Sequence, residues 1–252
     1  MNKFSFYIFG LLLIGLTSFS SCKEDDDPQD PNNPPTTNTD PTQTYSYEDA
    51  FGVLAAIKSV SYTTAGGYTV PVELATAVAV FMNSANASTF VDAGTVQLNS
   101  KALTRQTNNS YAYQDVMNPI TLNQVQLTVS GSSSVPSFSQ VVSKPIPDYS
   151  GFSTLPATIT RANGLEVNLS GAMSNADSVL VVLASGSGVV YKTVAGNASK
   201  VSFSASELSA LPASQQGMLQ VSPRNMTTET ISSKKYYFVN QATYTKMPVT
   251  VN

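Results

Sequence analysis

The chain has 252 residues and a formal net charge of −3, a length that suits one or two globular domains. Only 12% of the residues are charged, and the 14 glycines and 14 prolines favour short strands and turns over helices. Because the chain has no histidine and one cysteine, it cannot contain a Ser-His-Asp triad, a Cys-His dyad, a histidine-ligated metal or an intramolecular disulfide.

The first residues predict an export signal. Lys3 supplies a positive charge, and residues 4–16 are apolar but too few for a membrane-spanning helix, which needs about 20 residues. The only cysteine, Cys22, stands where such a signal should end. We therefore expect residues 1–21 to be a signal peptide that is removed from the mature chain.

The stretch Phe19-Ser20-Ser21-Cys22 resembles a lipobox, the processing site of bacterial lipoproteins, although leucine is usual in place of Phe19. The resemblance implies cleavage before Cys22, diacylglycerol on its thiol and acylation of the new amino group. Two or more acyl chains hold a protein stably in a bilayer, so Cys22 would anchor the chain to a membrane. The alternative is an ordinary secretory signal that happens to precede a cysteine.

A charged run follows the expected acylation site at once: Lys23, Glu24, Asp25, Asp26 and Asp27. It resembles the export signal of surface lipoproteins of Bacteroidota, which implies an outer-membrane protein that faces the cell exterior. The alternative is a solvated charge run that begins a tether. The run lacks the glycine and the bidentate glutamate of a calcium-binding loop, so we expect no metal there.

Residues 28–44 contain five prolines and almost no apolar residue, so we expect residues 22–44 to form a disordered tether. Two domains of similar size are expected to follow, at residues 45–147 and 148–252. The boundary is placed in residues 144–149, which contain two prolines and show no periodicity.

The first expected domain begins with strands at residues 52–63 and 68–81, joined by a turn at residues 65–67. Pro71 predicts an edge position or a bulge in the second of these strands. Asn99-Ser100 predicts a turn between strands at 95–98 and 101–104. Residues 125–129 alternate between apolar and polar side chains, as a half-buried strand does.

The second expected domain contains many short strands separated by glycine- and asparagine-rich turns. One short helix is expected near Ser204, where Ser204-Ala205-Ser206-Glu207 fits a capping box. The expected strands are residues 157–161, 165–169, 178–184, 189–194, 201–204, 218–221, 236–244 and 247–251. The chain is therefore predicted to be all-β, with two tandem antiparallel β-sandwich domains, the second of them immunoglobulin- or fibronectin-like.

Candidate chemical sites are few. A glycosidase needs two carboxylates that face each other across a cleft. The spacing of the carboxylates in the body selects no such pair, so a carboxylate-dependent hydrolase is an unfavoured alternative. Ser232-Ser233-Lys234-Lys235 matches a Ser-x-x-Lys pattern but also fits a polar turn, and the aromatic clusters at 111–113 and 236–238 are more typical of a core. We expect no catalytic residue, metal site or cofactor. The carboxylates are Glu73, Asp92, Asp115, Asp148, Glu166, Asp177, Glu207 and Glu229.

Asp177-Ser178-Val179 resembles the three-residue acceptor for protein O-glycosylation in Bacteroidota, which implies modification of Ser178; the start of a strand explains the same residues. The basic residues of the body are scattered, so no nucleic-acid partner is expected. The sequence favours a non-enzymatic outer-membrane surface lipoprotein with a binding, adhesion or envelope-structural role, whose partner is a polysaccharide or another envelope protein. The alternative is a glycan-capture accessory lipoprotein of a polysaccharide-uptake system.

Overall fold

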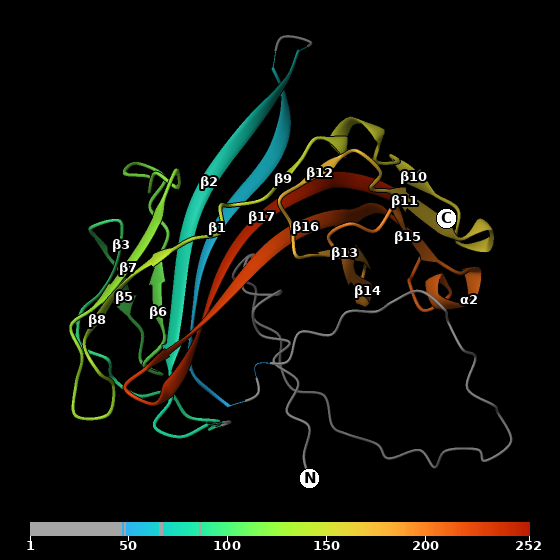
Figure 1. Cartoon of the computed structure of the whole chain (residues 1–252). Coiled ribbons are helices and arrows are strands. Elements are labelled where there is room, and N and C mark those ends of the chain that lie inside the picture. Colours follow the sequence, from blue (N-terminus) through green and yellow to red (C-terminus); the bar gives the residue numbers. More distant parts are fainter. Residues whose placement is uncertain (1–46, 48, 66–67, 86) are drawn as a thin grey trace, which may run out of the picture. The chain divides into compact units, whose positions relative to one another are not determined.

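The computed structural model describes residues 47, 49–65, 68–85 and 87–252, which are almost entirely β-structure with one short α-helix (Figure 1). The prediction of an all-β fold is confirmed. These residues belong to one compact unit, Asp40–Asn252.

The main sheet has nine strands in the order β14-β13-β16-β17-β1-β2-β6-β5, with β10 paired to β17 beside this path. Its neighbouring strands are antiparallel except for the β1–β17 and β10–β17 pairs, which are parallel. The strands are β1 (Ala50–Ala65), β2 (Tyr68–Phe81), β5 (Thr104–Arg105), β6 (Tyr111–Tyr113), β10 (Thr158–Ile159), β13 (Ser178–Ser185), β14 (Gly188–Ala195), β16 (Ser214–Ile231) and β17 (Lys234–Val251).

The remaining elements pack around this sheet. A second sheet has the order β4-β3-β7-β8, and two strand pairs, β9–β12 and β11–β15, stand apart from it. These elements are β3 (Val96–Leu98), β4 (Lys101–Ala102), β7 (Val125–Val129), β8 (Phe138–Val142), β9 (Asp148–Tyr149), β11 (Leu165–Asn168), β12 (Met173–Ser174), β15 (Lys200–Phe203), the 3-10 helices η1 (Gly151–Thr154) and η2 (Arg161–Asn163), and the α-helix α2 (Ala205–Leu208).

Several local predictions are confirmed. β1 and β2 form the expected hairpin, and β2 pairs only with β1 at Pro71, which is therefore an edge position. The turns at 99–100 and 232–233 have positive φ at both central residues, as tight hairpin turns require. At α2, Ser204 and Glu207 form the capping box: Glu207 N–H donates to Ser204 Oγ at 3.3 Å, and Ser204 N–H donates to Glu207 Oε2 at 2.8 Å.

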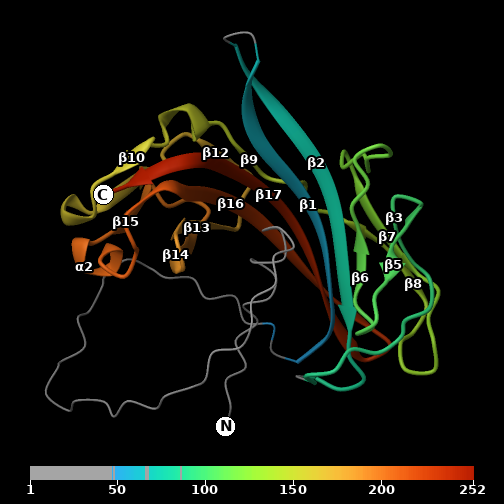
Figure 2. The same cartoon turned by 180° about the vertical axis from the view of Figure 1, so that it is seen from behind.

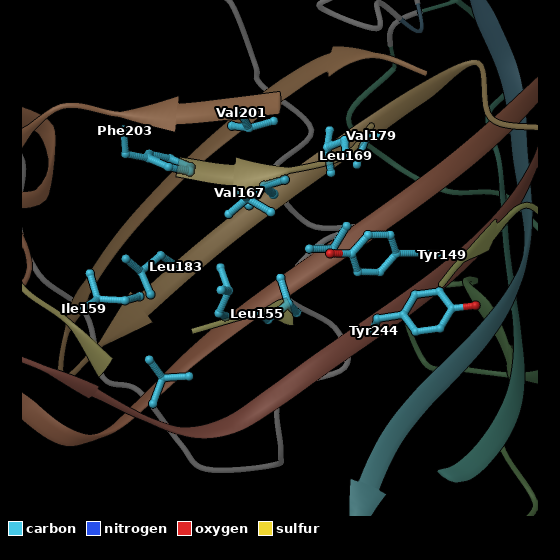
Figure 3. Packing of buried hydrophobic residues seen from close by; sticks show 14 of the residues in the cluster. Tyr149, Leu155, Ile159, Val167, Leu169, Val179, Leu183, Val201, Phe203 and Tyr244 are labelled. Atoms are coloured by element: carbon cyan, nitrogen blue, oxygen red, sulfur yellow. The ribbon is translucent and has the colours of Figure 1, made fainter. Parts of the chain in front are cut away.

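Two hydrophobic cores form along the main sheet. Figures 1 and 2 show β3–β8 gathered toward one end of the long strands, and β9–β15 with α2 toward the other. The first core includes Leu54, Phe81, Tyr111, Leu127 and Phe238. The second core includes Tyr149, Val181, Leu183, Phe203 and Tyr244. Figure 3 shows Tyr149, Leu183, Phe203 and Tyr244 converging with Leu155 from several strands and loops.

The long central strands serve both cores. β1 contributes Leu54 to the first core and Val60 to the second, and β17 contributes Phe238 to the first and Tyr244 to the second. β1 pairs with β17 from Ala50↔Lys235 to Ser61↔Thr245. The main sheet therefore joins the two sides of the expected boundary at 147/148, and the first core is built partly from the end of the chain.

Three expected strands in the second half were too short. The expected strand at 218–221 is part of β16, which continues to Ile231, and the expected strands at 236–244 and 247–251 are one strand, β17. The residues between Ser222 and Glu229 are mostly polar, so the sequence did not indicate that the strand continues through them. In the structure they pair with β17 and do not form a loop.

Candidate functional site

The candidate site is a pocket of about 180 Å³ beside the segment that was expected to link two domains. We call it the junction pocket. It is formed where the approach to β7, the end of β8, the chain that follows β8 and one residue of β17 meet. Its lining consists of residues 122–125, residues 141–146 and Asn240.

Two buried asparagines fix the wall of the junction pocket. Asn225 of β16 and Asn240 of β17 lie directly opposite each other in the sheet and are 3% and 1% exposed. Asn225 Nδ2 donates to the carbonyl oxygen of Pro145 at 2.8 Å, and Asn240 Nδ2 donates to that of Lys144 at 2.6 Å. The expected linker is thus held against the sheet by side chains from both central strands.

An ion pair strengthens the same wall. Lys144 Nζ lies 2.6 Å from Asp177 Oδ2, and the same carboxylate oxygen accepts the backbone N–H of Met226 at 2.9 Å. The backbone N–H of Asp177 donates to Asn225 Oδ1 at 3.0 Å. Lys144, Asp177, Asn225 and Asn240 therefore form one polar network between the segment after β8 and the main sheet. We call it the junction network.

The lining of the junction pocket mixes amide, hydroxyl and apolar side chains. Its polar lining side chains include Asn123, Gln124 and Ser143, which offer both donors and acceptors, and Val125 and Ile146 add apolar surface. No carboxylate stands among the lining residues. The volume is below the 300–1,000 Å³ of most ligand sites, so it suits a single small group. The one charged lining residue, Lys144, has its ammonium paired with Asp177, which leaves the amides and Ser143 as the uncharged polar groups of the lining.

Most carboxylates of the body make hydrogen bonds or ion pairs within the fold. Asp92 accepts hydrogen bonds from Gly94 N–H and Tyr111 O–H, each at 2.8 Å, and these bonds, with Arg105 beside them, lower its pKa. Others are held by ion pairs or hydrogen bonds: Asp115 with Met117 N–H, Asp148 with Tyr244 O–H, Glu166 with Lys200, Asp177 with Lys144, and Glu207 with Lys192.

Glu207 shows how such a carboxylate is tuned. Burial by itself would raise the pKa of Glu207, but hydrogen bonds from Ser204 and the nearby Lys192 ammonium outweigh it, and the pKa is lowered. Lys192 Nζ lies 3.0 Å from Glu207 Oε1. The charged carboxylate therefore joins the start of α2 to β14.

Most rings of the aromatic clusters lie in the interior, as predicted, while Tyr113 is half-buried and donates its hydroxyl to the carbonyl oxygen of Asn118. Tyr111, Tyr236 and Phe238 are 2%, 0% and 0% exposed, so these rings cannot stack on a ligand at the surface. Burial raises the pKa of Tyr236 to about 12. Burial and the hydrogen bond to Asp148 also raise the pKa of Tyr244. Both phenols are neutral under physiological conditions.

Ser178 begins β13 and has no exposed surface. Its hydroxyl is buried and has no hydrogen-bond partner within the described part of the chain. An acceptor hydroxyl has to reach the enzyme that modifies it, so this position argues against glycosylation of the folded protein. Ser232 and Ser233 form the hairpin turn, while Lys234 donates to the carbonyl oxygen of Ser134.

The expected lipidation site and export signal, Cys22 and residues 23–27, lie outside the described residues. In the portion of the chain that the structure describes, no helix has the length and apolar character needed to cross a membrane. Across residues 47–252, as far as they are described, no group of three or more acidic or cysteine residues is placed to bind a metal.

Comparison of the chain with protein-family models, with curated proteins and with solved structures finds no match. The function therefore has to be inferred from the residues and the geometry above.

Proposed function

We propose that the chain is a non-enzymatic lipoprotein, anchored through Cys22 in the outer membrane and facing the cell exterior, which binds a polysaccharide or another envelope protein. The junction pocket carries the binding part of this proposal, because amide and hydroxyl side chains line a hollow there, against a wall that two buried asparagines hold in place. The anchor rests on the resemblance of residues 19–27 to a lipobox followed by an acidic export signal.

For the fold, we propose that the two cores correspond to two sandwich-like lobes, the second immunoglobulin-like, which share strands β1, β16 and β17. Shared strands make the body a rigid support for a binding site, because the lobes cannot separate without breaking the central sheet.

The glycan-capture alternative has one specific observation in its favour. Amide side chains both donate and accept, and sugar hydroxyls do the same, so Asn123 and Gln124 match a hydroxyl-rich ligand better than a charged one. A pocket of about 180 Å³ is of the order of the engineered cavity of about 150 Å³ that holds benzene, so it has room for one ring.

The anchor is tested in cells by the Cys22→Ser variant. We expect wild type to partition into the detergent phase and to be labelled by a membrane-impermeant reagent on intact cells, and the variant to lose detergent partitioning. Replacing residues 24–27 with alanine should keep the lipid but reduce surface labelling. Equal detergent partitioning of wild type and Cys22→Ser would refute the anchor.

The pocket is tested by titrating neutral oligosaccharides into the purified protein and into a Gln124→Ala variant. Gln124 is exposed, so its replacement should leave the melting temperature within about 2 °C of wild type. Binding to wild type that weakens about tenfold in Gln124→Ala would support glycan capture. Binding of equal strength to both proteins would place the glycan elsewhere.

A further inference from the structure

The far end of the β1–β2 hairpin extends beyond the strands that flank it (Figures 1 and 2). β17 pairs with β1 only as far as Ser61↔Thr245, and β6 pairs with β2 only at residues 77–79. Among the described strands, β1 and β6 are the only ones that pair with β2. Residues 70–75 of β2 therefore have β1 on one side and an open edge on the other. We call this stretch the β2 edge.

Hydrogen bonds at the other end of β2 show which backbone groups of the β2 edge point outward. Met82 N–H donates to Phe51 O at 2.8 Å, whereas Phe81 O accepts Val91 N–H at 2.9 Å on the opposite side. Successive residues of an antiparallel strand direct their backbone groups to alternate sides, so even-numbered residues of β2 bond to β1 and odd-numbered residues point away from it. The outward-pointing residues of the β2 edge are Pro71, Glu73 and Ala75.

These three residues present a row of unused donors and acceptors. Glu73 and Ala75 each offer an N–H and a C=O, and Pro71 offers a C=O alone. Within the described part of the chain, none of these groups makes a hydrogen bond to another residue. The row continues the line along which β2 binds β6, so one further strand can extend the same ladder.

β6 does not fill this position, because its chain turns away after Tyr113, the residue that pairs with Ala77. Asp115 Oδ1 accepts Met117 N–H at 2.9 Å, and Tyr113 O–H donates to the carbonyl oxygen of Asn118 at 2.6 Å. These two bonds hold residues 114–118 in a turn. A strand that pairs with the β2 edge would therefore follow β6 along β2, in the direction of the hairpin tip.

The side chains of the β2 edge indicate what such a strand carries. Val70 and Val72 are 43% and 49% exposed on one face of the hairpin, which suits a strand with apolar residues at alternate positions. On the other face, Glu73 is exposed and forms no ion pair with any described residue. A lysine or arginine opposite Glu73 would complement its charge.

We propose that the β2 edge binds an extended segment of a partner protein as an additional strand, antiparallel to β2. The segment carries a basic residue between two apolar residues. It makes about five backbone hydrogen bonds with the edge: two at Ala75, two at Glu73 and one at Pro71, where the ladder ends. The site is distinct from the junction pocket, which contains no residue of β2.

A second copy of the chain fits the β2 edge poorly. Antiparallel pairing of two copies centred on Glu73 would place two carboxylates directly opposite each other, which is destabilising. Pairing Glu73 of each copy with Pro71 of the other would leave two carbonyl oxygens without donors, because proline has no N–H. Both residues therefore disfavour self-association, as edge strands commonly do, yet they admit a basic strand that ends at Pro71.

The test uses the mature chain, residues 22–252, with Cys22→Ser to prevent acylation. The probe is a fluorescent peptide with blocked ends, Ser-Thr-Val-Lys-Val-Thr-Ser. We expect the parent to bind it saturably, with a dissociation constant of about 1 mM or tighter. The same peptide methylated on the backbone nitrogen of its lysine keeps every side chain but cannot donate to Glu73 O, so its binding should be at least about tenfold weaker.

Three variants separate the backbone from the charge. Glu73→Pro removes an outward N–H, as Pro71 does, so it should melt within about 2 °C of the parent but bind the peptide about tenfold more weakly. Glu73→Gln keeps the N–H and removes the charge, so it should lose only about threefold. Leu74→Pro is the matched control: its N–H points to β1, so it should lower the melting temperature more than Glu73→Pro.

Weaker binding of both the methylated peptide and the Glu73→Pro variant would support the proposal. Absence of binding to the parent, equal binding of the methylated peptide, equal affinity of Glu73→Pro, or a parent dimer that Glu73→Pro dissociates would each overturn it. Unfolding of Glu73→Pro would also contradict it, because the N–H of residue 73 would then point to β1. Detergent partitioning and the Gln124→Ala titration test the anchor and the junction pocket separately, since neither involves β2.

Discussion

We expect the junction network to contribute measurably to stability, and Asn225→Ala is the variant that tests it. Asn225 is 3% exposed; its Nδ2 donates to Pro145 O, and its Oδ1 accepts from Asp177 N–H. A hydrogen bond contributes about 1 kcal/mol net, so losing both should cost about 2 kcal/mol. For a body of this size that corresponds to a fall in melting temperature of about 4–8 °C.

The matched control is Asn123→Ala, because Asn123 lines the same pocket but is exposed. Its loss should change the free energy of unfolding by less than about 0.5 kcal/mol. Urea denaturation measures both variants. Limited proteolysis adds a local measurement: wild type should resist cutting between residues 143 and 150, and Asn225→Ala should be cut there first.

Two results would refute this account of the junction. Equal free energies of unfolding for Asn225→Ala and Asn123→Ala would mean that the hydrogen bonds of the buried Asn225 add no stability. Rapid cleavage of wild type between residues 143 and 150 would mean that the segment is a flexible linker after all.

Further predictions concern buried hydroxyls, acid and fragments. Ser178→Ala should match or exceed wild-type stability, by up to about 1 kcal/mol, because it removes a buried hydroxyl without a partner. Because burial raises the pKa of Tyr236 from 10.0 to about 12, wild type should lose stability as pH rises over that interval, and Tyr236→Phe should lose less. The lowered pKa of Glu207 gives stability that is present above its ordinary value of 4.5 and lost as pH falls below it, so Glu207→Gln should be less stable at pH 7 and should lose less in acid. Residues 45–147 expressed alone should not fold, as circular dichroism will show, since their core lacks β17.

Local structure was predictable from the sequence where short-range chemistry decides it. The capping box at Ser204 and Glu207 needs only residues three positions apart, and the tight turns at 99–100 and 232–233 need only residues that tolerate positive φ. The alternation of residues 125–129 likewise identified a half-buried strand with the correct ends.

The strand order was not predictable, because it depends on pairing between residues far apart in the chain. Nothing in residues 50–61 indicates a parallel partner at residues 235–245, and a parallel pair requires a long connection that leaves no turn signal. The junction pocket was missed for the same reason. The amide of Asn240 comes from the end of the chain, and the two prolines of residues 144–149 suggested a linker although buried side chains hold the segment.

One signal in the sequence could have indicated that β1 is buried on both faces of the sheet. Residues 53–57 are apolar without alternation, and the pairing partners of Val53 and Ala55 in β2 and β17 are also largely apolar. A half-buried strand of a single sandwich would not carry this pattern. Unlike strand order, the pattern is local, so it is readable from the chain alone.

The strand arrangement also bears on how the body would carry load on the proposed anchor. A pull on Cys22 would enter the described body beside β1, which lies between β2 on one side and β17 on the other. The ladder with β17 is parallel and extends from Ala50↔Lys235 to Ser61↔Thr245, so a force along β1 would shear many backbone hydrogen bonds together rather than open them one at a time. If the force entered through an edge strand such as β14 instead, the hydrogen bonds of only one neighbouring strand would resist it. Placing the first strand at the centre of the sheet thus suits a body that is held by its N-terminus, whichever partner it binds.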